Sequence, residues 1–145
     1  MPNVEITVAG VDRIVAKLGK VESMRQLAPA MRRAVLRLQR DLQEYPPVRP
    51  GSRYVRGKGW ADANGVVTRL TSEKLGQRWT TKVTVSSTEL VGRVGNNASY
   101  APFVQSRQFQ ARVHQGRWLT DAGAMNRNAD AIVRDFETAI SDAVK

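Results

Sequence analysis

The feature that most constrains the fold is an unbroken apolar stripe that ends at two prolines. Its members follow one another at spacings of four, three, four and three residues, and they are Met31, Val35, Leu38, Leu42 and Tyr45. This spacing places them on one side of an α-helix. Pro29 suits the first turn, because the N–H that proline lacks would be unpaired there in any case. Pro46-Pro47 must end the helix.

A second amphipathic helix is predicted from about Asp121 to the end of the chain. Its apolar stripe consists of Ile132, Phe136, Ile140 and Val144, with Val133 and Ala139 beside it. Thr120 or Asp121 could cap its first turn. The acidic side chains Asp130, Asp135 and Glu137 are expected on its solvated face.

Strands are predicted near the N-terminus and again in the second half of the chain. Apolar residues alternate with polar ones at Val4, Ile6 and Val8, and residues 12–21 then predict a short helix. Residues 79–85 alternate again, and after a turn at 86–89 the apolar pattern returns over 90–94, which predicts a β-hairpin. We therefore expect one α+β domain over residues 1–145, a small antiparallel β-sheet packed against a long helix of the N-terminal half and a C-terminal helix.

Residues 46–65 predict a long basic loop. They include three prolines and four glycines and show little periodicity. A structureless segment of about twenty residues is uncommon in a compact domain, and such segments are usually functional or disordered. Bases and rings alternate within it, at Arg49, Arg53, Tyr54, Arg56, Lys58 and Trp60.

The charge is unevenly distributed along a chain of 145 residues with net charge +10. Residues 25–58 contain nine basic residues against two acidic ones, residues 98–120 contain three arginines and no acid, and residues 121–145 are net acidic. Such asymmetry predicts a polyanionic or acidic neighbour for the middle of the chain. No apolar run approaches the roughly 18 residues that span a bilayer, so we expect no membrane partner.

Catalysis is not expected. The chain has one histidine, His114, and no cysteine, which excludes Cys/His chemistry and metal sites with several histidines. We expect no catalytic residue, no metal ligand, no cofactor and no small-molecule substrate.

Two groups of side chains are candidates for contact with a partner. The first is basic, with a row on the long helix and a second set in the loop, and is assigned to a polyanion or protein partner: Arg33, Arg37, Arg40, Arg49, Arg53, Arg56 and Lys58. Arginine rows contact phosphates well, although a solvated helix face explains the row equally well.

The second group lies in residues 98–120, an expected interface arm that could be a short helix or irregular. Aromatic residues mixed with arginine are typical interface anchors, and core packing of Tyr100 and Trp118 is the alternative. The expected oligomer interface comprises Tyr100, Phe103, Phe109, Trp118, Arg107 and Arg112, with Asp130, Asp135 and Glu137 of the acidic helix as their complement.

The order of four pieces resembles a known family. A Tyr-Pro-Pro turn at residue 45, a basic loop, Lys74-Leu75-Gly76-Gln77-Arg78-Trp79 and a Tyr-Ala-Pro-Phe-Val stretch at residues 100–104 follow one another. This order resembles the tail-component family of tailed double-stranded DNA phages, which includes small neck and tail-completion proteins. The chain departs from the family at Gln105-Ser106-Arg107, where an acidic residue and a glycine turn are usual, and at a longer middle loop over residues 60–70.

The resemblance implies a structural virion protein that is assembled in the host cytoplasm and placed in the neck or tail. Its expected partners are copies of itself in a ring, expected to be hexameric, the neighbouring neck and tail proteins, and packaged DNA without sequence specificity. Tail terminator and head–tail adaptor are close alternatives within this reading. A basic accessory protein that binds nucleic acid is the alternative from another class.

Overall fold

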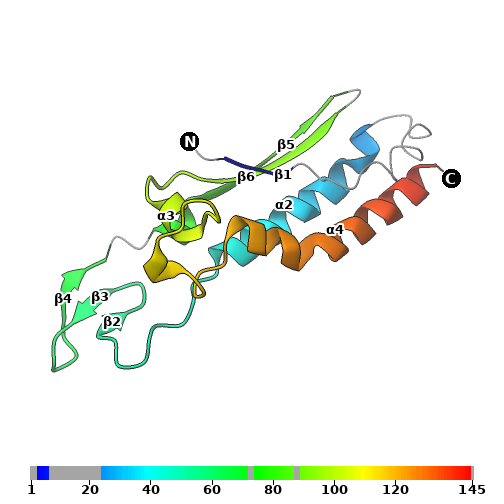
Figure 1. Cartoon of the computed structure of the whole chain (residues 1–145). Coiled ribbons are helices and arrows are strands. Elements are labelled where there is room, and N and C mark those ends of the chain that lie inside the picture. Colours follow the sequence, from blue (N-terminus) through cyan, green and yellow to red (C-terminus); the bar gives the residue numbers. More distant parts are fainter. Residues whose placement is uncertain (1–2, 7–23, 72–73, 87–88, 145) are drawn as a thin grey trace.

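A three-stranded antiparallel sheet, helix α2 (Ala28–Gln43) and helix α4 (Asp121–Ala143) form successive layers, with α2 between the sheet and α4 (Figure 1). The structure is a computed structural model that describes residues 3–6, 24–71, 74–86 and 89–144. The strand order in the sheet is β1 (Asn3–Ile6), β6 (Leu90–Asn96) and β5 (Trp79–Val85). The predicted α+β class is confirmed.

The long amphipathic helix forms where the apolar stripe predicts it. A short 3-10 turn, η1 (Met24–Leu27), leads into α2, and Pro29 lies in the first helical turn. Four members of the stripe, Met31, Val35, Leu38 and Leu42, are buried in the main core. The fifth, Tyr45, lies beyond the helix end and packs against a second, smaller apolar cluster.

The sheet lies directly against α2 because a glycine faces the helix. A Cβ built on Gly92 of β6 would approach Met31 Sδ to 2.5 Å and Val35 Cγ1 to 2.7 Å. Val94, on the same face of β6, is fully buried. The close contact between the two layers therefore depends on the missing side chain at position 92.

The C-terminal helix also agrees with its prediction. Thr120 caps α4 by accepting a hydrogen bond from the backbone N–H of Gly123 at 3.0 Å. Ile132, Phe136 and Ile140 are buried against α2 in the main core. The stripe is shorter than expected, because Val144 lies past the helix end and is exposed.

Polar contacts also join the two helices. Buried Asn128 of α4 donates to Asp41 Oδ2 of α2 at 2.8 Å and to the carbonyl of Ala124 at 2.9 Å. Burial raises the pKa of the Asp41 carboxyl, but the hydrogen bonds from Asn128 and Arg40 and the charges of Arg40 and Arg127 outweigh it, so the pKa is lowered. Asp41 therefore stays ionised between the helices.

The hairpin prediction is confirmed, with β6 extending two residues further, to Asn96. β5 and β6 pair in antiparallel register from Trp79↔Asn96 to Val85↔Leu90. The N-terminal strand is confirmed as β1, whereas Val8 and the helix expected over residues 12–21 lie outside the described residues.

The prediction that residues 46–65 lack regular structure is wrong for their second part. Strands β2 (Tyr54–Val55), β3 (Gly59–Ala61) and β4 (Val67–Leu70) form a second antiparallel sheet, in the order β2-β3-β4. Figure 1 shows it projecting away from the three layers. Strands of two and three residues are too short for a period of two to be visible in the sequence.

Residues 98–120 form an internally bonded segment. It contains the short helix α3 (Ala101–Gln105) and a 3-10 turn, η3 (Arg112–His114). The segment is therefore a short helix in one part and irregular in the rest, so each of the two alternatives holds for part of it. The side-chain amide of Gln110 donates to the carbonyls of Val104 at 2.8 Å, Trp118 at 3.2 Å and His114 at 3.3 Å. Through these bonds, one side chain connects α3 with η3 and with Trp118.

Candidate binding site

A cleft of about 680 Å³ opens between the extended chain that follows α2, the small sheet and the segment 98–120. We call it the basic cleft. Sixteen of the described residues line it, and none of these is acidic: Val48, Arg49, Pro50, Gly51, Ser52, Tyr54, Arg56, Trp60, Thr71, Leu75, Tyr100, Val104, Val113, His114, Arg117 and Trp118. Its volume is typical of sites that bind small molecules or a few residues of a larger ligand.

The floor of the basic cleft belongs to the second apolar cluster. Leu75, in the 3-10 turn η2 (Leu75–Gln77), is buried together with Ala101 and Val104 of α3. Trp118 packs edge-on against Tyr45 with ring centroids 5.2 Å apart. Tyr45 in turn accepts a hydrogen bond from the backbone N–H of Gly76 at 2.8 Å, which ties the end of α2 to η2.

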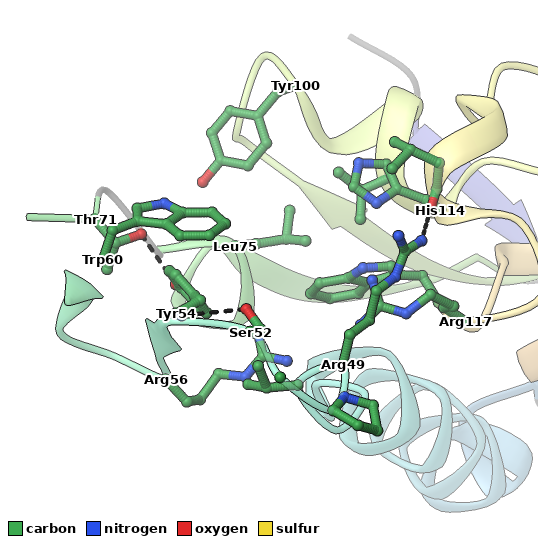
Figure 2. A pocket seen from close by; sticks show the side chains of 16 residues that line it. Arg49, Ser52, Tyr54, Arg56, Trp60, Thr71, Leu75, Tyr100, His114 and Arg117 are labelled. Carbon is green, nitrogen blue, oxygen red and sulfur yellow. Dashed lines mark hydrogen bonds between the residues drawn. The ribbon is translucent and has the colours of Figure 1, made fainter. Parts of the chain in front are cut away.

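Three further rings stand at the mouth of the cleft. Figure 2 shows Trp60, Tyr54 and Tyr100 around one side of it. Tyr54 and Trp60 are cross-strand neighbours with ring centroids 5.2 Å apart. The guanidinium of Arg56 lies 5.5 Å from the Tyr54 ring centroid, and that of Arg69, which does not line the cleft, lies 5.5 Å from the Trp60 ring centroid. These cations help to fix the orientation of the rings.

Two arginines connect the walls of the cleft on its other side. Arg49 donates to the carbonyl of Val113 at 3.2 Å, and Arg117 donates to the carbonyl of Pro47 at 3.1 Å. The two bonds run in opposite directions between chain segments about seventy residues apart. Among the described residues, no carboxylate lies within ion-pair distance of either guanidinium. Both arginines are thus positioned by carbonyls, without an ion pair to any described carboxylate.

His114 lies in a partly buried, positively charged part of the cleft, which lowers the pKa of its imidazole. Burial lowers the pKa of its imidazole, and the charges of Arg117 and Arg49 lower it further. Its Nδ1 is enclosed and has no hydrogen-bond partner among the described residues, so a proton there would have no acceptor. The neutral ring is favoured for both reasons.

The four aromatic residues assigned to the interface divide into two kinds. Phe103 and Phe109 are 57% and 54% exposed, and Tyr100 is also exposed. Trp118 is half-buried against the second cluster, so the core alternative holds for this residue. Arg107 and Arg112 are exposed in the same segment.

The helical residues assigned to partner contact are partly engaged within the chain. Arg37 and Arg33 of α2 pair with Asp135 of α4, with N–O distances of 3.2 and 3.8 Å. Arg40 pairs with Asp41 at 3.1 Å. Asp130 and Glu137 are exposed on α4.

Of the basic loop residues assigned to partner contact, two line the cleft and two do not. Arg49 and Arg56 line the cleft, whereas Arg53 and Lys58 are exposed beside it. Arg56 also donates to the carbonyl of Pro46 and lies over the ring of Tyr45, 5.3 Å from its centroid.

Sequence reasoning left several cleft residues out of the candidate set. Tyr54 and Trp60 had a signal, the alternation of rings and bases, whereas the place of Leu75 and Val104 in the cleft depends on contacts between distant segments. Three of the hydroxyls in the cleft bond to neighbours: Ser52 Oγ accepts from the Tyr54 N–H at 3.1 Å, and Tyr54 donates to Thr71 Oγ1 at 3.1 Å. The arrangement is suited to holding an anionic ligand with flat apolar groups.

Within the part of the chain that the structure describes, no group of three histidine or acidic side chains could hold a metal ion. No described helix has both the length and the apolar character needed to cross a bilayer. Comparison of the chain with models of known protein families, with curated proteins and with solved structures finds no match.

Proposed function

We propose that this chain is a structural subunit of a tailed-phage virion, a neck or tail-completion protein that closes into a ring at the head-proximal end of the tail. The resemblance described above supplies the identity. Tail terminator and head–tail adaptor are ring subunits of the same kind and stay as alternatives within the proposal.

The observation that carries the proposal is the placement of exposed apolar side chains in two separate patches. The sheet patch lies on the face of the small sheet opposite to Trp60 and comprises Val55 and Leu70, which both pair with Gly59. The arm patch lies in residues 98–120, outside the basic cleft, and comprises the exposed rings of Phe103 and Phe109. Leu70 is 85% exposed. Exposed apolar patches mark protein contacts, and a cyclic array needs two different surfaces on each subunit, joined head to tail.

The sheet of β1, β6 and β5 offers a second way for subunits to associate. Among the described residues, β1 and β5 form its two edges. An edge strand presents backbone N–H and C=O groups that can pair with a strand of another chain. A neighbouring subunit could extend the sheet while covering one of the patches.

The test is the assembly state of the purified full chain and its place in particles. Light scattering and electron microscopy should show a closed ring, and an antibody against the chain should label the head-proximal end of the tail in phage particles made with it. Particles that lack the protein, together with a purified chain that stays monomeric or forms a two-fold dimer with matching surfaces, would overturn the proposal.

The basic cleft favours the second candidate, an accessory protein that binds nucleic acid. A steep loss of affinity for DNA with rising salt, in a chain that neither forms rings nor enters particles, would support this candidate instead.

A further inference from the structure

We propose that the basic cleft is a binding site for single-stranded nucleic acid, in which bases stack on Trp60 and Tyr100 and Arg49 and Arg117 bind the phosphates. The site is independent of ring formation and is assigned from the contacts of the described residues.

The first argument is the meeting of two acid-free segments. Residues 45–60 contain four basic residues and no acidic one, and residues 98–120 contain three and none. They are far apart in the sequence, yet they form opposite walls of the basic cleft and are joined by the Arg49–Val113 and Arg117–Pro47 bonds. A concave surface lined by one sign of charge concentrates the opposite charge, and a polyanion gains most from it.

The second argument is that aromatic and aliphatic side chains line the cleft between its arginines. Rings stand at the mouth and apolar side chains form the floor. Proteins that bind single strands combine a basic groove with aromatic side chains on which successive bases stack. A duplex keeps its bases paired and stacked on one another, so it can use the arginines but not the rings. The cleft therefore favours single strands over duplexes.

The third argument concerns an acidic peptide, which would also match the charge. An extended peptide carries N–H groups that need acceptors, and the wall carbonyls of Pro46, Pro47 and Val113 already accept from arginines. The prolines at 46, 47 and 50 offer no N–H in return. Phosphates need donors only, and each guanidinium has five N–H groups of which one is used in the bond across the cleft.

The experiment measures binding of the full chain to labelled single-stranded oligothymidylate by fluorescence anisotropy at two salt concentrations. A duplex of the same length and poly-glutamate serve as competitors. We expect oligothymidylate to bind more tightly than either. Trp60→Ala and Tyr100→Ala should each weaken binding about tenfold or more, as expected for loss of a stacked base, and Trp60→Phe should retain most of it.

The arginines make a separate prediction. Arg117→Gln and Arg49→Gln should each reduce the slope of log K against log salt by about 0.7, the value for one phosphate contact of a single strand. Two controls lie outside the cleft, the exposed apolar side chain of Leu36 and the exposed charge of Arg134. Leu36→Ala and Arg134→Gln should leave affinity and slope unchanged.

Four results would overturn the proposal. They are absence of binding, equal affinity for the duplex, displacement by poly-glutamate at equal charge, and control variants that weaken binding as much as the cleft variants do. If Trp60→Ala opens the small sheet, Tyr100→Ala decides the question, because Tyr100 lies outside every strand.

Discussion

At the scale of single residues, Gln105 links distant segments of the chain through its side-chain amide. Its side chain is buried, and Nε2 donates to the carbonyls of Leu42 at 3.0 Å and Leu119 at 3.1 Å. These carbonyls belong to the end of α2 and to the approach to α4. An ionised carboxylate at this position could donate to neither.

Gln105→Glu should therefore destabilise the fold by about 3 kcal/mol at neutral pH, because the carbonyls of Leu42 and Leu119 lose their donor and a charge is buried. The cost should shrink as the pH falls towards 5, since a protonated carboxyl regains one O–H donor. Urea unfolding of the variant and the wild type at matched pH measures both effects. Gln108→Glu, at an exposed position nearby, is the control and should be close to neutral. Equal stability of Gln105→Glu at every pH would contradict the bonding described.

His114 predicts a pH dependence whose sign follows from its lowered pKa. The unfolded chain has a histidine pKa near 6.5, and burial with Arg117 and Arg49 holds the folded value below it. As the pH falls, the unfolded state takes up the proton first, so this residue destabilises the fold progressively below about pH 7.

The stability difference between His114→Gln and the wild type should thus shift in favour of the variant on acidification from about pH 7.5 to about pH 5.5. Urea unfolding at the two pH values gives the difference, and the carboxylates common to both chains cancel. Parallel loss of stability in both proteins would show that the imidazole of His114 titrates normally.

At the scale of elements, the sequence predicts those whose apolar pattern is long enough to be periodic. α2, α4 and the β5–β6 hairpin each repeat their pattern over several positions, and the structure confirms them. The sequence does not predict β2, β3 and β4, because strands without a buried face need no alternation of apolar and polar residues. Of residues 54–70, only Gly59 is buried. The small sheet depends instead on a glycine and a turn, and turn chemistry is difficult to separate from a loop.

Gly59 makes the small sheet testable as an element. Its φ is +139°, and a Cβ there would lie 2.0 Å from the carbonyl oxygen of Arg69. Gly59→Ala should open the β3–β4 pair and accelerate tryptic cleavage after Lys58 and Arg69, while the thermal transition of the three layers stays in place. Gly65→Asn is the control, because no atom lies within 4 Å of a Cβ at Gly65 and asparagine tolerates its φ of +82°. Unchanged cleavage in Gly59→Ala would mean that the small sheet adapts to the clash.

At the scale of the whole molecule, the candidate site arises from contacts that no single segment specifies. Each basic segment could be recognised by composition, but the pairing of Arg49 with the Val113 carbonyl and of Arg117 with the Pro47 carbonyl exists only in the fold. The same holds for Asp135, which is assigned to a neighbour by its acidity and is paired with Arg33 and Arg37 of its own chain. Charge patterns predict attraction, and the packing of α2 against α4 decides which charges meet.

The arm patch gives the last prediction, which concerns assembly. Phe103→Ala and Phe109→Ala should leave a folded monomer, because both rings are more than half exposed and contribute little to the core. Both variants should fail to form rings or enter particles, since a buried aromatic anchor contributes roughly 2 kcal/mol or more to an interface. Circular dichroism checks the fold, and light scattering and particle composition check assembly. Leu36→Ala is the matched control, because Leu36 is equally exposed on α2 but lies outside both patches. Unfolding of the isolated Phe103→Ala variant would place that ring in the core, and normal ring formation by both variants would remove the arm patch from the interface.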